Sequence, residues 1–384
     1  MKVIIWGNNL QNTLGLVRSV GMKGYEVILL LEPIKKSNSY VRHSKYISKI
    51  HYLNSLQEGI DVLLREYGNE PEKLVVLCGS DPTICMLDAH YEQLKDKFHI
   101  FNAGEQGRIN LFEDKLNQFK IAEQCGIRTI RTWHISDIAK LPSDIPYPCL
   151  VKGNNSVKST KGDLFICNSK DELEHSLKKG IDYLVQEYIE KDYELNINAF
   201  SYNHGDNVLI PAGIHKLRDG LYEQGIFMRL DPIEDFIGLD VEKLKLFIKK
   251  IGYEGIFSIE FLCKDNAYYL LEINMRNDGC GWLYTAAGIN YPYLWIKYSE
   301  GKLTQDIIDS VKLKNHVYLM HENDMYNLVK GKVSLWQWIK DFHKTKAFYI
   351  ANCKDPMPFI VSTWIHVRQL GKIILHKCFG LNIK

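Results

Sequence analysis

The sequence has no run of 18 or more apolar residues, so none of its segments is predicted to span a bilayer as a helix. Its 48 Lys and Arg balance 46 Asp and Glu, whereas a dedicated nucleic-acid binder needs a basic excess to neutralise phosphates. The nine cysteines form no CxxC pair, which disfavours a disulfide framework and a structural zinc site. The apolar stretch at residues 3–6 is too short for a secretory signal, so a cytoplasmic protein with reduced thiols is expected.

Several catalytic motifs are missing as well. The sequence contains no GxxxxGK[ST] loop, no HExxH and no GxSxG. Gly7 follows the first apolar stretch, where a phosphate-binding turn would lie, but the next glycine is Gly15 and the GxGxxG pattern is absent. An oxidoreductase that binds a dinucleotide on the N-terminal region is therefore disfavoured.

The first hundred residues alternate between strand and helix patterns, which predicts a doubly wound parallel α/β domain over residues 1–102. The expected strands are Lys2–Trp6, Glu26–Leu31 and Leu74–Cys78, and the expected helices are Leu10–Lys23 and Leu56–Tyr67. Ser80 or Asp81 is the expected N-cap of the next helix. The turn-rich stretch at residues 102–107 marks the end of this domain.

The rest of the chain predicts α+β structure. The expected elements are helices at 113–124, 170–179 and 241–250 and strands at 128–133 and 149–152, with further strands predominating up to about residue 275. We expect three further units: 103–185 with a phosphate loop, 186–300 with a metal site, and a mainly helical extension at 301–384.

Two acidic residues and an amide lie where a hairpin would bring them together. Glu272, Asn274 and Arg276 are two apart and therefore share one face of a strand, and the turn at residues 264–266 predicts pairing with the strand that carries Glu260. Carboxylate and amide oxygens suit Mg²⁺. The alternative is a solvated sheet face, but the apolar neighbours of both carboxylates indicate that they are enclosed.

A second group of residues is suited to phosphate. Lys115 opens a helix, Lys152 lies 37 residues later at the end of a strand, and a small, polar, basic loop follows at residues 153–162. The run Gln186–Ile189 precedes Glu194. In this order and spacing, the two groups resemble the ATP-grasp superfamily over roughly residues 1–300. The resemblance implies that an N-terminal α/β domain precedes an ATP-grasp fold of two α+β subdomains.

The resemblance implies a site for ATP. Lys115 and Lys152 would hold the phosphates, together with Ser156 and Lys158 of the loop, while a contact by Lys161 is left open. The adenine would lie against the run Gln186–Ile189. In that run, the Glu187 carboxylate would accept from the amino group and the backbone at Tyr188 and Ile189 would read the ring edge. Glu194 would bind the ribose.

The resemblance also implies a metal and catalytic set. Glu260, Glu272 and Asn274 would hold two Mg²⁺ ions, with Mn²⁺ as an alternative metal, and Arg276 would stabilise the transferred phosphoryl group or an acyl phosphate. Within the superfamily, the chain resembles the carboxylate–amine ligase branch that includes D-aspartate ligase-like enzymes. Lys216 and Arg218 match the Lys-x-Arg element of that branch and would act in catalysis. The segments 336–339 and 355–359 also resemble that branch.

These roles imply an ADP-forming ligase that joins a small-molecule carboxylate to an amine through an acyl phosphate. Its substrates would be amino acids, peptides or sugar acids of cell-surface polysaccharide or cell-wall synthesis, and no nucleic acid would be involved. The alternative is a protein that binds ATP without turnover, as a sensor or regulatory subunit. The intact set of lysines and carboxylates favours the enzyme. A homodimer is left open.

The tail is basic and amphipathic. Residues 356–384 contain four Lys or Arg and no acid, and at helical spacing Trp364 and Val367 fall on an apolar side. Such a helix could lie on an anionic membrane as a peripheral contact, or pack on its own domain or a partner subunit. Packing is the expected outcome.

Overall fold

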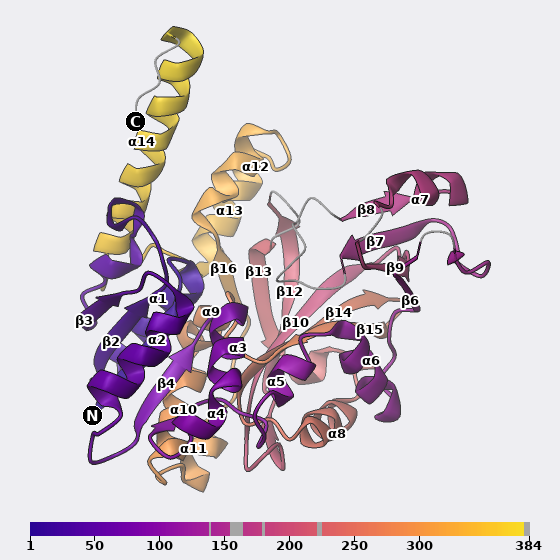
Figure 1. The fold of residues 1–384 in the computed structure, drawn as a ribbon. Coiled ribbons are helices and arrows are strands. Elements are labelled where there is room, and N and C mark those ends of the chain that lie inside the picture. The colour runs from indigo at the N-terminus through magenta and orange to yellow at the C-terminus, as the bar shows by residue number, and fades with distance from the viewer. Residues whose placement is uncertain (138–139, 154–163, 179–180, 221–224, 380–384) are drawn as a thin grey trace.

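The computed structural model describes residues 1–137, 140–153, 164–178, 181–220 and 225–379, with side chains placed as far as residue 368. Three sheets and the helices around them make up these ranges (Figure 1). Within the same ranges, every helix is either too short or too polar to traverse a bilayer.

The first sheet is parallel, with its strands in the order β3-β2-β1-β4-β5. The strands are β1 (Lys2–Gly7), β2 (Glu26–Leu31), β3 (Ile47–Tyr52), β4 (Leu74–Cys78) and β5 (Phe98–His99). The helices are α1 (Gln11–Gly21), α2 (Leu56–Val62, continued by a π-helical turn Leu63–Tyr67), α3 (Asp81–Ala89) and α4 (Tyr91–Leu94). Every residue of β4 is buried because helices cover both faces of the sheet. The predicted doubly wound parallel fold is confirmed.

The edge strand β3 was not anticipated from the sequence. Its residues Ile-Ser-Lys-Ile-His-Tyr alternate imperfectly between apolar and polar, and none is fully buried. An edge strand needs no continuous apolar run, because one side of it faces solvent.

Two short helices connect this domain to a small second sheet. They are α5 (Arg108–Leu111) and α6 (Lys115–Gln124), and the Asp114 carboxylate caps α6 by accepting from the Leu116 amide at 2.9 Å. The second sheet is antiparallel and has the order β6-β9-β7-β8. Its elements are β6 (Thr132–Ile135), β7 (Cys149–Gly153), β8 (Phe165–Cys167), β9 (Tyr183–Glu187) and the covering helix α7 (Lys170–Ser176). The sheet has a small hydrophobic core of its own, separate from the main core.

The third sheet is the largest and runs in the order β15-β14-β10-β12-β13-β16-β17, with β11 beside β10. Its strands are β10 (Tyr193–Tyr202), β11 (Asn207–Leu209), β12 (Ala212–Asp219), β13 (Gly225–Pro232), β14 (Gly255–Lys264), β15 (Ala267–Asn274), β16 (Val317–Met320) and β17 (Thr345–Phe348). The helix α8 (Val241–Ile251) packs against α6 and β11. The predicted hairpin is present as β14 and β15, and its turn places Asp265 and Asn266 at positive φ.

The remaining helices are α9 (Gly281–Ala286), α10 (Tyr291–Ser299), α11 (Gln305–Asp309), α12 (Met325–Val329), α13 (Leu335–Lys344) and α14 (Met357–Phe379). The first two pack on α1 and thereby join the N-terminal domain to the large sheet. The extension is helical for most of its length, as expected, but β16 and β17 add two strands to the large sheet. Both are four-residue strands, which are too short to give a clear periodic pattern.

The tail helix packs on the N-terminal domain, but two of the described side chains on its predicted apolar side are exposed. Trp364 is 66% exposed and Val367 is 54% exposed, whereas Ile365 and Ser362 lie on the buried side of α14. The helix contacts the turn Val41–His43 of the N-terminal domain and then extends away from the body of the protein (Figure 1). Trp364 and Val367 therefore contribute to the surface and not to the core.

Candidate active site

A cavity of about 560 Å³ lies between the small antiparallel sheet and the hairpin β14–β15. Residues from both sheets and from the start of α6 line it, among them Lys115, Lys152, Gln186, Glu187, Tyr188, Ile189, Glu194 and Glu272. The structure thus brings together the described residues that the sequence predicted to bind nucleotide. Ser156 and Lys158, with Lys161, lie outside the described residues, but Leu164 and Phe165, which follow that loop, line the same cavity.

Two ammonium groups lie close together on the wall of this cavity. Burial, together with the neighbouring charge of Lys115, lowers the pKa of Lys152 to about 7. In the described part of the chain, no carboxylate lies within ion-pair distance of Lys152. Burial also opposes the charge of Lys115, but Glu272 outweighs this effect and raises the pKa of Lys115. Two partly buried cations, of which only Lys115 has an ion-paired carboxylate among the described residues, form a site for an added anion such as phosphate.

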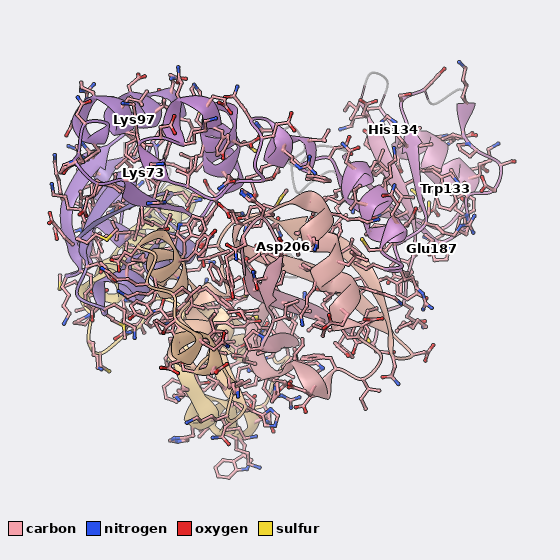
Figure 2. All side chains as sticks on the ribbon, turned by 90° about the horizontal axis from the view of Figure 1, so that it is seen from below. Lys73, Lys97, Trp133, His134, Glu187 and Asp206 are labelled. Atoms are coloured by element: carbon pink, nitrogen blue, oxygen red, sulfur yellow. The ribbon has the colours of Figure 1, made fainter. Side chains whose placement is uncertain are left out.

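The far end of the cavity is formed by the segment that follows β9. The Glu187 amide donates to the Arg131 carbonyl oxygen at 3.1 Å, and the Tyr188 amide donates to the Pro148 carbonyl oxygen at 3.3 Å. The Ile189 amide has no partner among the described residues, although it lies at the cavity wall. Figure 2 labels Glu187 together with Trp133 and His134 on the small sheet.

The carboxylates predicted to bind metal form one row across three strands. Asn196 of β10 is paired with Glu260 of β14, and Glu260 is paired with Glu272 of β15, so the three side chains share a sheet face. The Asn196 side-chain amide donates to Glu260 at 3.4 Å, and that of Asn274 donates to the same oxygen at 3.5 Å. The ladder between β14 and β15 has an irregularity immediately after Glu260.

The two carboxylates of this row differ in their electrostatic surroundings. Burial, together with the negative charges of Glu272 and Asp278, raises the pKa of Glu260 to about 8. Burial would also raise the pKa of Glu272, but its ion pair with Lys115 and the charges of Lys152 and Arg276 lower it to about 2. Within the described residues Glu260 has no ion pair. A partly buried carboxylate that faces a cavity and has only two long hydrogen bonds is suited to a divalent cation.

Arg276 links this row to the N-terminal domain. Its guanidinium binds both oxygens of Asp81, with Nη2–Oδ2 at 3.1 Å, and approaches Asp278 at 3.8 Å. Burial would lower the pKa of Arg276, but Asp81 and Asp278 outweigh that effect and raise it. Ser80 is the N-cap of α3, because its hydroxyl accepts from the Thr83 amide, which leaves the Asp81 carboxylate free to hold Arg276.

A second cavity of about 360 Å³ adjoins the first and shares Glu194 and Leu271 with it. Its wall is assembled from three distant parts of the chain: α1, the large sheet and the C-terminal extension. The residues that the sequence analysis did not anticipate are Gln11, Asn196, Asp278, Cys280, His321 and Tyr349. Apart from Asp278 and Cys280, which lie two positions apart, each comes from a different segment, so only the folded chain reveals the group.

Lys216 and Arg218 have different surroundings, although they were predicted to act together. Lys216 lines the second cavity and forms ion pairs with Glu194 and Asp219. Arg218 instead binds the buried carboxylates of Asp324 and Asp341. Register shifts around Arg218 in the pairing of β12 with β13 explain why two residues that are two apart do not share one environment. Arg218 is not among the residues that line either cavity.

Glu194 has more partners than its predicted ribose contact implies. Its carboxylate binds Lys191 and Lys216 at the boundary between the two cavities. Burial would raise the pKa of Glu194, but the hydrogen bonds from these two ammonium groups outweigh it and lower the pKa. Glu194 therefore carries a negative charge and positions Lys216 at the entrance to the second cavity.

A small antiparallel sheet faces a larger one across a cavity of lysines and carboxylates, in agreement with the resemblance to the ATP-grasp superfamily in the sequence. Residues 182–322 match a family model described as ATP-grasp in the biosynthetic pathway with Ter operon. The N5-carboxyaminoimidazole ribonucleotide synthase of Staphylococcus aureus (strain COL) is 24% identical over 330 residues, which cover 83% of this chain and 80% of that protein.

Solved structures show the same fold. An L-amino acid ligase from Bacillus licheniformis superposes with a TM-score of 0.65 at 16% identity and covers 83% of this chain and 79% of its own. The biotin carboxylase domain of the Hydrogenobacter thermophilus 2-oxoglutarate carboxylase, in complex with MgADP and bicarbonate, has a TM-score of 0.62 at 17% identity. That match covers 82% of this chain and 73% of the other.

Proposed function

We propose that this protein is an ATP-dependent carboxylate–amine ligase, which forms an amide through an acyl phosphate and releases ADP and phosphate. The observation that carries the proposal is the pair of carboxylates Glu260 and Glu272, each lining one of two adjoining cavities, with Asn274 and Arg276 beside them. One cavity has the size and polarity for a nucleotide, and the other is a polar space for a second substrate. The similarity to an L-amino acid ligase supports the same reaction type.

In the first cavity, adenine would lie against the segment after β9. The free Ile189 amide would donate to a ring nitrogen, and the Glu187 carboxylate would accept from the amino group. The phosphates would then extend toward Lys115 and Lys152, whose charges are concentrated and only partly neutralised. Phosphoryl transfer depends mainly on positioning and charge neutralisation, which these two lysines supply.

The fit to Mg²⁺ follows from the oxygen donors present. Glu260 is partly buried and has no ion pair in the described residues, and Glu272 and Asn274 lie beside it on the neighbouring strand. These three residues would hold the metal, with two Mg²⁺ ions as the expected number. Bound Mg²⁺ neutralises phosphate charge and polarises the bond that is broken. The MgADP complex of the biotin carboxylase domain supports this assignment.

In the second cavity, an oxygen of the substrate carboxylate would attack the γ-phosphorus, so that the bond to the β–γ bridging oxygen breaks and ADP leaves. The amine nitrogen would then attack the acyl carbon, expel phosphate and lose a proton. Arg276 would stabilise the negative charge of the acyl phosphate and of the tetrahedral intermediate. Lys216, held by Glu194, would bind a substrate carboxylate in the same cavity. Amino acids, peptides and sugar acids of cell-surface polymers are the substrate classes that we propose.

A phosphate-release assay over a matrix of carboxylates and amines, with ADP and AMP resolved, tests the proposal. We expect release of ADP and phosphate that requires Mg²⁺ and both substrates. AMP as the product would rule out the acyl-phosphate route. Thermal stabilisation by Mg·ATP without turnover on any pair would favour the alternative of an ATP-binding regulator.

A further inference from the structure

Exposed apolar side chains are concentrated in the C-terminal extension. Of the 23 large hydrophobic side chains that are exposed in the described residues, eleven fall between residues 325 and 367. We call this group, on α12, α13 and the first part of α14, the C-terminal apolar surface. Its members are Met325, Tyr326, Val329, Leu335, Trp336, Phe342, Met357, Phe359, Ile360, Trp364 and Val367. Apolar exposure concentrated in this way in one segment of the chain indicates a docking surface.

The same segment carries most of the imbalance of charge in the chain. Residues 325–384 contain ten Lys or Arg and two Asp or Glu, whereas the rest of the chain contains 38 and 44. Both acids, Asp341 and Asp355, are buried and bound to arginines of the body, so neither offsets the surface charge. The lysines at 330, 332, 340, 344, 346 and 354 are all exposed. The surface is therefore strongly cationic.

Apolar and basic groups alternate on this surface. The Lys330 ammonium lies 4.7 Å from the centre of the Tyr326 ring, and that of Lys340 lies 5.6 Å from the centre of the Trp336 ring. Trp336 is 67% exposed and Trp364 is 66% exposed. Tryptophan beside lysine is typical of side chains that lie at the boundary between lipid head groups and acyl chains.

Figure 1 shows that α12, α13 and α14 project from the same end of the molecule. We propose that the C-terminal apolar surface binds the protein to an anionic membrane, with its tryptophans in the head-group region and its lysines on lipid phosphates. The positive charge of the surface favours an anionic membrane over a second copy of the chain as its binding partner. A symmetric contact with a second copy would bring two strongly cationic surfaces together, which is unfavourable, whereas an anionic bilayer complements them. The proposal is independent of the ligase reaction.

Co-sedimentation of the full-length protein tests this proposal. The vesicles contain either phosphatidylcholine alone or equal parts of phosphatidylcholine and phosphatidylglycerol, at low and at high salt. We expect binding to the anionic vesicles at low salt, little binding to the neutral ones, and weaker binding at high salt because ions screen the lysines. Absence from the anionic pellet at low salt would overturn the proposal.

Two matched triple variants test whether vesicle binding depends on the lysines of this surface or on the overall positive charge of the protein. The triple variant Lys330→Gln, Lys332→Gln and Lys340→Gln should bind anionic vesicles about a hundredfold more weakly, at roughly fivefold for each lysine. The control triple Lys73→Gln, Lys97→Gln and Lys120→Gln removes the same charge elsewhere; Figure 2 shows Lys73 and Lys97 on the N-terminal domain. Equal losses in the two triples would contradict a localised membrane contact.

The apolar contribution is tested by Trp336→Ser combined with Trp364→Ser. Because both side chains are exposed, the variant should unfold at the wild-type temperature and yet lose most vesicle binding. Ile237→Ser is the control, since Ile237 is 75% exposed on another part of the protein. Sedimentation velocity provides a further check. A dimer that the tryptophan substitutions dissociate, together with no vesicle binding, would assign the surface to a second copy and overturn the proposal.

Discussion

The guanidinium of Arg18 on α1 and the carboxylate of Asp355, at the start of the segment leading to α14, form an ion pair at 3.0 Å. Both side chains are almost fully buried, although the residues are 337 positions apart in the sequence. Arg18 also donates to the Ile350 carbonyl oxygen at 2.7 Å. Tyr349, which precedes Ile350, lines the second cavity. The Arg18–Asp355 pair therefore holds the part of the C-terminal extension that forms this cavity wall.

We predict that Asp355→Ala lowers the free energy of unfolding by about 3–5 kcal/mol, because it leaves the buried Arg18 without its counter-charge. The Ser44 hydroxyl and the Lys45 amide, which donate to the same carboxylate, would also lose their acceptor. Urea unfolding followed by circular dichroism measures the change. Lys354→Ala alters the adjacent, exposed residue and should change stability little. Equal stability of the two variants would contradict the anchoring role.

Glu272→Gln should retain the fold and lose turnover by about a hundredfold, since a charged ligand of the proposed Mg²⁺ site becomes neutral. The rate of phosphate release at saturating substrates measures this effect. Glu234→Gln, which alters an exposed carboxylate outside the cavities, is the control. A near wild-type rate in Glu272→Gln would show that this residue does not bind the metal.

Asp81 is predicted to act as a positioning residue through Arg276. Asp81→Asn should lower kcat by about tenfold to a hundredfold, with little change in KM for ATP, because the guanidinium loses the partner that orients it. If Asp81 acts only through Arg276, the double variant Asp81→Asn, Arg276→Lys should be no slower than Arg276→Lys alone. Additive losses in the double-mutant cycle would assign Asp81 a separate role.

The proximity of Lys115 and Lys152 predicts a substitution that stabilises the protein, in contrast to Asp355→Ala. Lys152→Met should stabilise the free protein, because burial and Lys115 both oppose the charge of Lys152, while stabilisation by Mg·ATP should be lost. The folded pKa of Lys152 is about 7, against 10.5 for a free lysine. As the pH falls through this window, only the unfolded chain takes up the proton, so the wild type loses stability.

The difference between the variant and the wild type should therefore grow as the pH is lowered from about 10.5 and level off below about pH 7. Denaturant midpoints measured across this range provide the test. The exposed Lys120→Met is the control and should show no such trend. A difference that does not vary with pH would contradict the electrostatic explanation.

The strands whose residues are nearly all buried could be predicted from the sequence, because burial on both faces imposes an unbroken apolar run. β1, β2 and β4 have this pattern, and the hairpin β14–β15 was marked by its turn. The edge strand β3 and the short strands β16 and β17 were missed, since strands with one open side or only four residues need no such run.

The residues of the candidate active site likewise fall into those that the sequence could predict and those that it could not. Residues within one motif, such as Glu272 and Asn274, could be anticipated because strand periodicity places them on one face. Gln11, His321 and Tyr349 could not, since they meet only after α1, β16 and the extension have folded onto the large sheet. The separation of Arg218 from Lys216 depends on an irregularity in strand pairing that no residue pattern signals.

The second cavity also has a consequence for synthesis on the ribosome. The described wall of the nucleotide cavity is complete once residues 115–272 have emerged, whereas the other cavity needs Tyr349 and the anchor at Asp355. A growing chain of about 300 residues would thus be able to hold a nucleotide before it has a closed compartment for the acyl group. Under the proposed function, an acyl phosphate would therefore form only after the C-terminal extension has completed the second cavity.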